Sequence, residues 1–362
     1  MLQAYAIENL RPGMKVGRDV IAIDGEVLLR AGQTLTRESI GSLLERPIFS
    51  IYVEENAEVV EIPGKEHLLD SSYVSCYERA YAQVKRLMLE ISQDSKMDAG
   101  VLDVIVSDID HDLASDGAKA ISQIHNMERT GAYIFHHSLN VGILAALMGN
   151  WLGWEQQKRE ELIIAGLLHD VGKLGIDSEL LDKVEPLTAE EFAHIQRHTD
   201  YGVAMLMNAG EKRESVLSGA GQHHERCDGT GYPLALGKED ISDFGKIVAF
   251  LDIYDAMASD RAFVPRFSPF DAFAAIMDDT MAGKLDPEFS VLFVRQTCRA
   301  LLGAWVELTN GVRGRIVYIP ESRIKALPLI HTVHDEFIDL EARTDLKLKA
   351  ILTAAELGTV HK

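Results

Sequence analysis

Cysteine is scarce in this sequence, and its scarcity excludes two kinds of protein. The 362 residues include 3 cysteines, and Cys76, Cys227 and Cys298 stand far apart. An odd, scattered set forms neither a disulfide framework nor the paired spacing of a cysteine zinc site. The first residues, MLQAYAIENLRPGMKVG, carry charges where the apolar core of a signal peptide should be. The sequence therefore predicts a protein of the reducing cytoplasm.

Basic residues and long apolar runs are also in short supply. Lys and Arg number 36 against 56 Asp and Glu, which gives a formal net charge of −20. A chain this acidic is a poor partner for DNA, RNA or an anionic membrane surface. No stretch approaches about 18 uninterrupted apolar residues, so we expect no membrane span. An anionic substrate must then be held by a few local cations or by metal ions.

The length and the changes of pattern along the chain predict several modules. A chain of 362 residues exceeds one ordinary hydrophobic core. We predict a small α+β module over residues 1–56, a helical connector over 57–128, a helical domain over 129–300 and a β-rich extension over 301–362.

The two ends of the chain carry strand and turn signals. In DVIAIDGEVLLRAGQTL the alternation about Asp24 and Gly25 predicts a hairpin, and Thr36 is placed to cap a short helix. IFSIYVEE predicts a further strand. Near the other end, WVELTNGVRGRIVYIP predicts two strands joined by a turn at Asn310 and Gly311, and LPLIHTVHDEFIDL predicts another extended stretch.

Between the ends, apolar residues recur at the three- and four-residue steps of amphipathic helices. Residues 66–128 predict two or more long helices, which serve either as a connector packed on the next domain or as an arm that pairs with a second subunit. Further helices are predicted over 137–150, 159–169, 188–208, 214–225, 245–260 and 269–280. Residues 226–244 hold glycines and a proline instead, and predict a shaped loop.

Residues 162–176, LIIAGLLHDVGKLGI, combine an apolar helix with chemically active side chains. Because positions i and i+4 share a helix face, His169 and Lys173 can look into one cavity, with Asp170 beside them. An imidazole next to a carboxylate suits a divalent transition metal, and an ammonium suits a phosphate. Taken alone, the group is equally consistent with a helix cap or a surface pair, and Lys173 with a cation at a helix C-terminus.

The wider distribution of histidine and aspartate favours the metal. Further polar side chains stand in four other apolar segments: His137, His198, the adjacent His223 and His224, and Asp252. A carboxylate inside the apolar run IVAFLDIYDAM needs a cation or hydrogen bonds, because burying it without a partner is costly. Imidazoles and carboxylates that converge from separate helices are typical of metal sites in helical bundles.

These segments resemble, in order and approximate spacing, the motifs of the HD-GYP family. The resemblance spans roughly residues 130–300 and rests on HHSLNV, LLHDVGKLGI, LTAEEFAHIQRHTDYG, HHERCDGTGYP and IVAFLDIYDAMASDRAF. It implies a mainly α fold, the HD-superfamily helical bundle, and metal-dependent phosphodiesterase activity toward cyclic di-GMP. The N-terminal module is similar to small domains often found ahead of HD-GYP domains, a likeness that assigns it no ligand.

The resemblance also implies roles for individual residues. Its metal ligands fall on His137, His169, Asp170, His198, His223, His224 and Asp252. Asp170 would bridge two ions. One ion would lie with His137, His169 and Asp252, and the other with the remaining histidines. The contacts to substrate fall on Lys173, Gly231, Tyr232, Pro233 and Arg261. In this scheme Asp170 and Lys173 are the catalytic residues: a hydroxide shared by two metals attacks phosphorus, and Lys173 helps to neutralise the developing charge.

The sequence departs from the family pattern at three positions. Members with three metals carry a glutamate four residues before the first ligand histidine, where this chain has Tyr133. A phenol stays neutral at pH 7, so we expect a binuclear site. Val264 replaces a further basic position, which removes one phosphate contact. Cys227 replaces an aromatic residue and is expected to be a small packed residue, not a zinc ligand. Mixed imidazole and carboxylate ligation favours Fe or Mn over Zn, Ni or Mg.

The other histidines have no assigned role. His136 is expected at the surface or behind the ligands, and His194, four residues before His198, could support it from behind. The rest are expected to be ordinary polar positions: His111, His125, His331, His334 and His361.

The sequence thus predicts a phosphodiesterase that converts cyclic di-GMP to pGpG, with GMP as an alternative end product. A second hypothesis is a cyclic-dinucleotide-binding adaptor with little turnover, which signals to partner proteins through the GYP loop and the helical arm. A third keeps the enzyme and changes the substrate to another cyclic dinucleotide or to pGpG. The complete ligand set favours an enzyme, while Tyr133 and Val264 leave room for slow catalysis.

Overall fold

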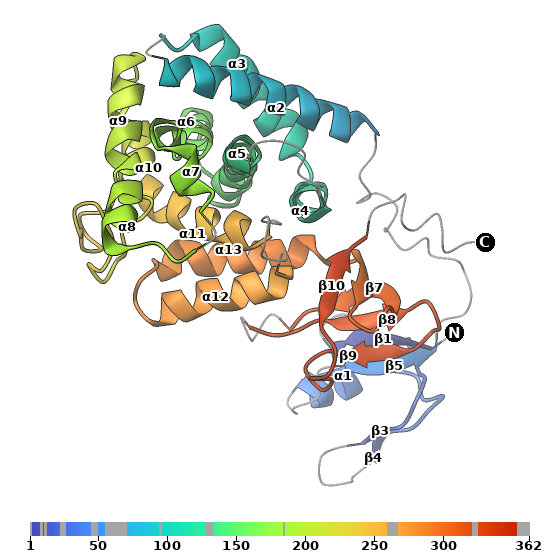
Figure 1. The fold of residues 1–362 in the computed structure, drawn as a ribbon. Helices are drawn as coiled ribbons and strands as arrows, with labels where there is room; N and C mark the ends of the chain where they lie inside the picture. Colours follow the sequence, from blue (N-terminus) through green and yellow to red (C-terminus); the bar gives the residue numbers. More distant parts are fainter. Residues whose placement is uncertain are drawn as a thin grey trace. The chain divides into compact units, whose positions relative to one another are not determined.

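The computed structural model describes residues 2–7, 10, 13–21, 27–44, 50–54, 71–93, 96–126, 133–183, 185–258, 267–320 and 325–352 (Figure 1). The chain divides into two compact units, Met1–Pro63 and Gly64–Lys362. Each unit has its own hydrophobic core.

The first unit is a small α+β module. Its sheet is antiparallel, in the order β1 (Leu2–Ala6), β5 (Ser50–Glu54) and β2 (Lys15–Val16), and a separate hairpin pairs β3 (Val20–Ile21) with β4 (Val27–Leu29). Helix α1 (Arg37–Leu44) follows Thr36, whose side-chain oxygen accepts the backbone N–H of Ser39. The predicted cap and the strand in IFSIYVEE are confirmed. The turn predicted at Asp24 and Gly25 lies outside the described residues.

Helices make up most of the second unit, and the prediction of a mainly α fold is confirmed. In chain order they are α2 (Ser71–Ser92), α3 (Ala99–Ser107), the π-helix η2 (Asp108–Leu113), α4 (Gly117–Asn126), α5 (Tyr133–Trp151), α6 (Gln156–Leu168), the 3₁₀-helix η3 (Val171–Gly175), α7 (Ser178–Leu181), α8 (Ala189–Gln196), α9 (His198–Asn208), α10 (Glu214–Gln222), α11 (Asp243–Ala258), α12 (Pro269–Met281) and α13 (Pro287–Ala300). Among the described helices, none has the length and apolar character that crossing a membrane requires.

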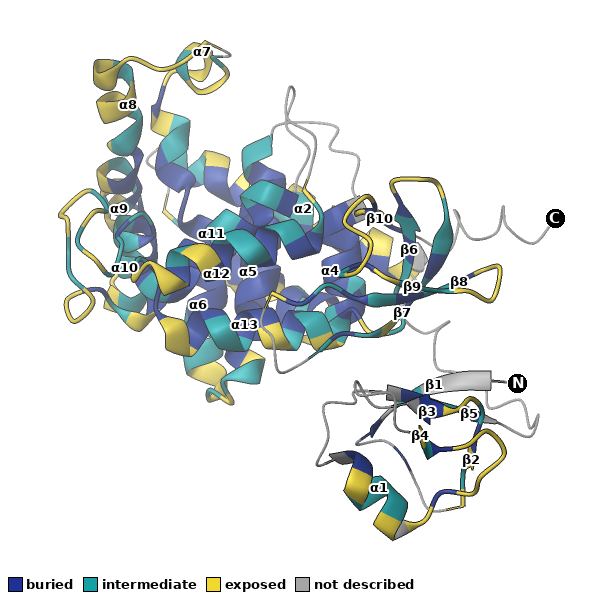
Figure 2. Ribbon diagram, turned by 90° about the horizontal axis from the view of Figure 1, so that it is seen from below, coloured by how far each residue is buried: buried dark blue, intermediate teal, exposed yellow. Residues whose placement is uncertain are grey.

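Helix α5 lies at the centre of the second unit. Every residue from Phe135 to Gly149 is buried, and the helix packs against α6, α11 and α2. The sequence explains this burial, because a helix that is apolar on nearly every face must be covered all round. Figure 2 shows α5 buried along most of its length, whereas α7 and α8 are largely exposed.

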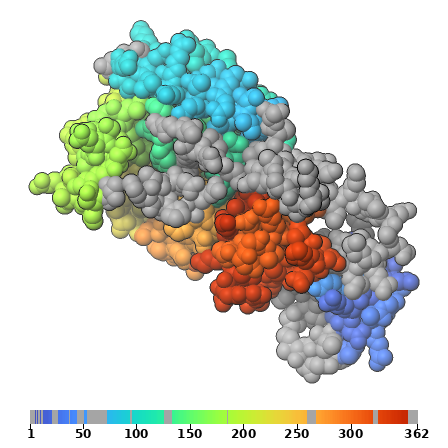
Figure 3. Space-filling view, turned by 45° about the vertical axis from the view of Figure 1, so that its right-hand side comes forward, coloured from blue at the N-terminus to red at the C-terminus, as the bar shows by residue number. Residues whose placement is uncertain are grey.

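Helices α2 and α3 lie next to each other on the outside of the same unit (Figure 3). Helix α2 packs on α5 and η2 through buried side chains at helical spacing, which include Tyr73, Tyr77, Ala80, Val84 and Met88. The segment therefore packs against the helical domain, as one of the two alternatives predicted. Pairing with a second subunit stays a prediction.

Apart from shifts of a few residues at helix ends, the helices differ from the predicted ones at two places. Residues 188–208 form two helices, because the backbone N–H of Arg197 bonds to the carbonyl of His194 and ends α8 there. Helix α13 was not predicted at all. Its start is nevertheless marked in the sequence, since Asp286 accepts the N–H of Glu288 and Pro287 fills the first turn.

The C-terminal part of the second unit is an antiparallel sheet in the order β10-β6-β7-β8-β9. Its strands are β6 (Trp305–Leu308), β7 (Arg313–Tyr318), β8 (Leu329–Thr332), β9 (Phe337–Asp339) and β10 (Leu348–Ile351). Gly311 has φ +82 and its N–H bonds to the carbonyl of Leu308, which confirms the turn predicted at Asn310 and Gly311. Val306 and Ile316 belong to the same core as the helices.

Candidate metal centre

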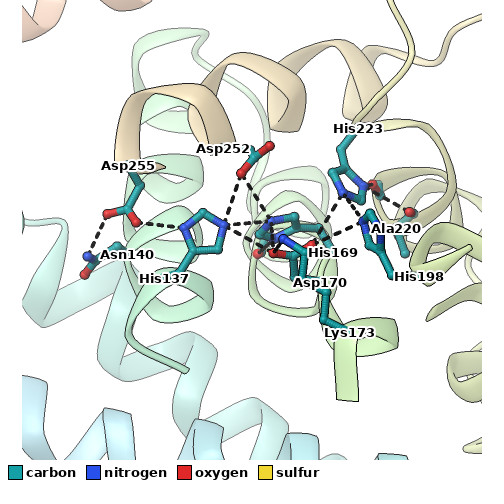
Figure 4. Close-up of polar contacts among 12 residues, drawn as sticks. His137, Asn140, His169, Asp170, Lys173, His198, Ala220, His223, Asp252 and Asp255 are labelled. Atoms are coloured by element: carbon teal, nitrogen blue, oxygen red, sulfur yellow. Dashed lines mark hydrogen bonds and ion pairs between the residues drawn. The ribbon is translucent and has the colours of Figure 1, made fainter. Parts of the chain in front are cut away.

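Imidazoles and carboxylates from several helices converge on Asp170 (Figure 4). His137 comes from α5, His198 is the first residue of α9, His223 is the C-cap of α10, and Asp252 comes from α11. The four histidines and the aspartate at the centre are at most 1% exposed: His137, His169, Asp170, His198 and His223. A polar cluster this deeply buried requires internal compensation for its lost hydration.

Asp170 stands at the junction of two helices. Helix α6 ends at Leu168, His169 is its C-cap, and Asp170 precedes η3. The prediction that His169 and Lys173 share one face of a continuing helix is therefore wrong. Lys173 reaches the cluster nonetheless, since its ammonium donates to Oδ2 of Asp170 over 2.6 Å.

Gly172 makes this junction possible. A Cβ at this position would overlap the backbone of His198 and of Gly202 in α9. Because no side chain separates them, η3 and α9 lie in direct backbone contact. The motif HDVG thus contains both the polar residues and the glycine that lets His198 approach Asp170.

One group of donor atoms lies between α5, α11 and the end of α6. Nε2 of His137 is 3.1 Å from Nε2 of His169, 3.1 Å from Oδ1 of Asp252 and 3.4 Å from Oδ2 of Asp170. Nε2 of His169 is 3.5 Å from the same Oδ2. Nitrogen and oxygen atoms gathered this closely can hold one divalent ion.

A second group lies between η3, α9 and α10. Nε2 of His198 is 3.2 Å from Nε2 of His223, and the two nitrogens are 3.4 and 3.6 Å from Oδ1 of Asp170. His224 offers a further ring nitrogen, and the donor atoms of the group all lie within 4.8 Å of one another. This group can hold a second divalent ion.

Asp170 belongs to both groups. Its Oδ2 faces the first and its Oδ1 the second. Oδ1 is buried and makes no hydrogen bond to any described residue. An anionic oxygen in that position is very costly unless a cation accompanies it. The shared carboxylate, its unsatisfied oxygen and the surrounding imidazoles fit a pair of divalent ions.

The imidazoles are held from behind in two ways. Three of them donate from Nδ1 to a carbonyl of the preceding helical turn, at 2.8 to 3.0 Å: His169 to Gly166, His198 to Ile195 and His223 to Ala220. His137 differs, because its Nδ1 donates to Oδ2 of Asp255 over 2.7 Å. In every case the hydrogen sits on Nδ1, so the lone pair of Nε2 points into the cluster.

At His169, His198 and Asp170 the environment favours the protonation states that bind metal. Burial lowers the pKa of His169 to about 3 and the pKa of His198 to about 4. Burial would raise the pKa of Asp170, but Lys173 and then His169 outweigh it and hold that pKa well below its ordinary value. Neutral imidazoles and ionised carboxylates are the forms that coordinate divalent ions.

Tyr133, at the position of the family's glutamate, stacks on a proposed ligand. Its ring and that of His137 have centroids 5.3 Å apart and an interplanar angle of 13°. Burial lowers the pKa of His137, but Tyr133 and the neighbouring carboxylates Asp170, Asp252 and Asp255 raise it above its ordinary value.

The glycine-rich loop lies against the second group. The ring of Tyr232 stacks on that of His224 with centroids 4.6 Å apart, and the N–H of Tyr232 donates to the carbonyl of His224. A Cβ at Gly231 would overlap the preceding backbone, so the loop reaches this position only with glycine there. Pro233 follows in the same loop. The predicted Gly231, Tyr232 and Pro233 are therefore beside the cluster.

Two residues at the site were missed by the sequence analysis. Glu225 is buried, and its carboxylate accepts the N–H groups of Leu234 and Leu236 at 2.7 and 2.9 Å, which fixes the loop. Asp255, behind His137, was visible as a second acid in IVAFLDIYDAM. Its spacing of three residues from Asp252 puts both on one helix face.

The other residues singled out in the sequence do not join either donor group or lie outside the described part of the chain. Arg261 and Val264 lie outside the described residues. Cys227 is half-buried, belongs to neither donor group, and has a pKa raised by burial. His136 and His125 are both 3% exposed, so of the two alternatives for His136 the surface one is wrong. His194 is exposed.

A third group of possible ligand atoms is already filled by a protein cation. Cys76, Asp108 and Asp112 lie together on the outer helices. The guanidinium of Arg79 donates to Oδ2 of Asp108 over 3.1 Å and to Sγ of Cys76 over 3.4 Å. The arginine supplies the positive charge there, so we assign no metal to this group.

Comparison with known proteins supports the same family as the motifs. A family model described as HD domain matches residues 113–289. The chain is 28% identical over 239 residues to the cyclic di-GMP phosphodiesterase PA4108 of Pseudomonas aeruginosa, covering 65% of this chain and 57% of that protein. It is 35% identical over 165 residues to a cyclic di-GMP phosphodiesterase of Thermotoga maritima, covering 44% and 43%. It is 34% identical over 156 residues to 3'3'-cGAMP-specific phosphodiesterase 3 of Vibrio cholerae, covering 43% and 34%.

These relatives are longer than the matched segment, and the chain spans between about a third and just over half of their length. Among solved structures, Bd1817, an HDG"Y"P protein from Bdellovibrio bacteriovorus, matches with a TM-score of 0.50 and 18% identity over 81% of this chain and 98% of that one. That likeness shows a common fold. The HD domain match over residues 113–289, the relatives and the fold agree with the motifs and support the resemblance to the HD-GYP family.

Proposed function

We propose that this protein is a metal-dependent phosphodiesterase that hydrolyses cyclic di-GMP to pGpG. The observation that carries the proposal is the division of the Asp170 carboxylate between two groups of buried imidazoles, with its Oδ1 left without a hydrogen bond. A pair of divalent ions held by these residues would supply a Lewis acid and a nucleophilic water for phosphate ester hydrolysis. The activity in the names of the Pseudomonas and Thermotoga relatives supports the same chemistry.

The proposed ligands come from the two donor groups. The first ion would be held by His137, His169 and Asp252 with Oδ2 of Asp170, and the second by His198, His223 and His224 with Oδ1 of Asp170. Mixed imidazole and carboxylate ligation favours Fe or Mn. Neither group includes a described cysteine, which makes a thiolate zinc site a poor description of this centre.

Lys173 is the residue that we propose to meet the phosphate. Its ammonium lies beside Oδ2 of Asp170 and is partly exposed, so it can donate to a non-bridging oxygen at the same time. Neutralising charge that develops on phosphorus is the usual role of such a cation. Arg261 is proposed as a second cation on sequence grounds alone.

The loop is proposed to hold the nucleotide. Tyr232 is half-buried beside His224, and burial, followed by the charges of Asp252 and Asp170, raises the pKa of its phenol. The hydroxyl therefore stays protonated and can donate to a phosphate, ribose or base. Gly231 and Pro233 shape the loop around it.

Hydrolysis opens the ring of the dinucleotide at one ester. The hydroxyl of water adds to phosphorus, the bond from phosphorus to the 3′ oxygen breaks, and that oxygen takes up the proton, which yields linear pGpG. A second cleavage would give GMP. The relatives named as 3'3'-cGAMP-specific enzymes make that cyclic dinucleotide the second candidate substrate.

We further propose the cytoplasm as the compartment, because the three cysteines are all free. Partner proteins at the GYP loop remain a sequence-based proposal.

The test is product analysis on protein loaded with Mn²⁺ under anaerobic conditions. Cyclic di-GMP, 3'3'-cGAMP and pGpG are supplied separately, and Asp170→Asn serves as the inactive control. We expect pGpG from cyclic di-GMP and no product from the variant. Faster turnover of 3'3'-cGAMP would transfer the proposal to that substrate. Tight binding of a dinucleotide without any product would favour the adaptor instead.

A further inference from the structure

A continuous series of hydrogen bonds joins the outer helix α2 to the imidazole of His137. The hydroxyl of Tyr77 donates to Oδ1 of Asn140 over 2.8 Å. Nδ2 of Asn140 donates to Oδ1 of Asp255 over 2.7 Å, and Oδ2 of Asp255 accepts Nδ1–H of His137 over 2.7 Å. The part of this relay from Asn140 to His137 is visible in Figure 4.

The directions of these bonds are set by the carboxylate. Asp255 can only accept, so Nδ1 of His137 must carry hydrogen and Asn140 must present its amide nitrogen. With its nitrogen turned toward Asp255, the Asn140 amide presents its oxygen on the other side, and that oxygen accepts the hydroxyl of Tyr77. Each link therefore fixes the next, and the last one leaves the lone pair of Nε2 of His137 facing the first donor group.

The relay is fully enclosed. Tyr77, Asn140 and Asp255 are each 0% exposed, and His137 is 1% exposed. Water cannot replace a missing member as it would on the surface, so the geometry depends on the side chains themselves. Tyr77 and Tyr81 on α2 also enclose His136: the ring of Tyr81 stacks on it with centroids 3.9 Å apart, and the hydroxyl of Tyr77 lies 3.4 Å from its Nδ1.

Tyr77 lies outside the region that the HD domain match covers, residues 113–289. We propose that Tyr77 is a positioning residue of the metal centre: through Asn140 and Asp255 it holds His137 in the tautomer and orientation that binding an ion requires. Helix α2 then contributes a residue that orients a metal ligand, and it is not only a connector. This inference rests on the proposed metal site, and adds to it a residue from outside the matched domain.

The experiment compares Tyr77→Phe with Tyr73→Phe in the full chain. Both substitutions remove one buried hydroxyl from α2 and keep the ring. Tyr73 donates to the carbonyl of Leu113 over 2.8 Å and does not belong to the relay. Binding of Mn²⁺ to the chelator-treated protein is measured by calorimetry, and ions per chain are counted after gel filtration. We expect Tyr77→Phe to lower the affinity for one of the two Mn²⁺ ions about tenfold, which is the lower end of the loss when a residue supporting a metal ligand is removed. Tyr73→Phe should leave both affinities unchanged.

A double-mutant cycle tests the route of the effect. If Tyr77 acts through Asn140, then Tyr77→Phe adds no further loss of Mn²⁺ affinity in an Asn140→Ala background. Additive losses would contradict the relay. If Asn140→Ala fails to fold, the comparison of the two tyrosine variants still decides.

The inference is overturned if Tyr77→Phe and Tyr73→Phe lower the melting temperature to a similar extent and both keep the wild-type affinity for Mn²⁺. Tyr77 would then be only a packing residue. Equal weakening of both ions would also contradict it. These readouts use no substrate. A wild-type protein that binds two ions but cleaves no dinucleotide would defeat the proposed function and leave this inference standing.

Discussion

Both halves of the candidate centre contain imidazoles held by a backbone carbonyl of the preceding helical turn, but only the half with His137 also depends on a side chain from another helix. On the α9 and α10 side, Nδ1 of His198 and of His223 donates to a carbonyl within its own stretch of helix. On the α5 side, Nδ1 of His137 donates to the carboxylate of Asp255, which comes from α11, far along the chain. The first arrangement needs only local helical geometry. The second needs α5, α11 and α2 packed correctly together.

This difference predicts which substitutions outside the ligands should affect metal binding. A backbone carbonyl cannot be removed by substitution, so the α9 and α10 half is insulated from changes in distant side chains. A carboxylate supported by an amide and a phenol can be weakened one member at a time. We therefore expect the half that contains His137 to be the adjustable one.

The largest effect is expected from Asp170→Asn, which should damage both halves at once, because each uses one oxygen of this carboxylate. We expect turnover to fall by at least the roughly 10²- to 10³-fold that losing one preorganised electrostatic group costs, and both ions to be lost. Steady-state kinetics and metal analysis check this. Asp182→Asn, an exposed change in the same region, is the matched control. Retention of two ions by Asp170→Asn would show that Asp170 is not the bridge.

Asp255→Asn should separate the halves. An amide cannot accept from both His137 and Asn140 as the carboxylate does, so the ion beside His137 should bind about 10- to 100-fold more weakly. The other ion should keep its affinity. Mn²⁺ titration of the metal-free chain measures both, with Asp243→Asn, exposed on the same helix, as control. An equal loss of affinity for both ions would contradict the proposed difference between the two halves.

Gly172→Ala tests the contact by which the halves meet. The added methyl group would overlap backbone atoms of α9, so η3 must move away. We expect a loss of about 1–3 kcal/mol in the free energy of unfolding, measured by denaturant titration. Gly237→Ala, where a Cβ makes only an ordinary contact, should change stability little. A Gly172→Ala protein of wild-type stability would mean that the two segments do not lie this close.

Tyr133→Glu would sharpen the comparison by adding a carboxylate to the adjustable half. The wild-type phenol stacks on His137, whereas a glutamate at this position brings a carboxylate, the ligand type of the three-metal pattern. We expect the number of tightly bound ions per chain to rise from two to three by elemental analysis. Tyr133→Phe, which keeps the stacked ring, should still bind two. A count of three in the wild-type protein would refute the binuclear expectation.

The smallest predicted effect is on the acid stability of the metal-free protein. The pKa values of His169 and His198 fall on folding, to about 3 and about 4, because both rings are buried. Between about pH 6.5, the ordinary histidine pKa, and about 3 to 4, these two imidazoles are therefore protonated in the unfolded chain and neutral in the folded chain. Stability should fall as the pH drops through that window.

A melting-temperature series on chelator-treated protein from pH 7 to pH 4 checks this. His198→Asn should show a shallower decline, because one titrating ring has been removed. His137 does not affect stability between about pH 4 and about 6.5. Its pKa is raised on folding, so the stability that it contributes is lost only as the pH rises above about 6.5. An equally steep decline in His198→Asn would contradict the assignment.

The sequence identified the residues of the site better than their local geometry. His137, His169, Asp170 and Asp252 could be selected because each is polar in an apolar context, and the linked motifs joined them. The expectation of one helix running through His169 and Lys173 failed. Periodicity does not reveal that Gly172 packs on the backbone of α9, which is a tertiary contact.

The supporting residues were harder to predict for a related reason. Glu225 looks like a surface acid in the sequence and Asp255 is only a second acid in an apolar run, and the packed structure alone shows what each accepts. Tyr77 sits in a helix whose sequence gives a plain amphipathic pattern, so nothing marks it apart from its neighbours Tyr73 and Tyr81. Such roles depend on which helix faces which, and that is decided by the core as a whole.

The measurement that tests the central claim most directly combines metal analysis and turnover on one anaerobically purified sample. The account predicts about two Fe or Mn ions per chain and conversion of cyclic di-GMP to pGpG or GMP by that same sample. A sample that carries both ions, binds the dinucleotide and releases it uncleaved would contradict the claim and identify the protein as a binding adaptor.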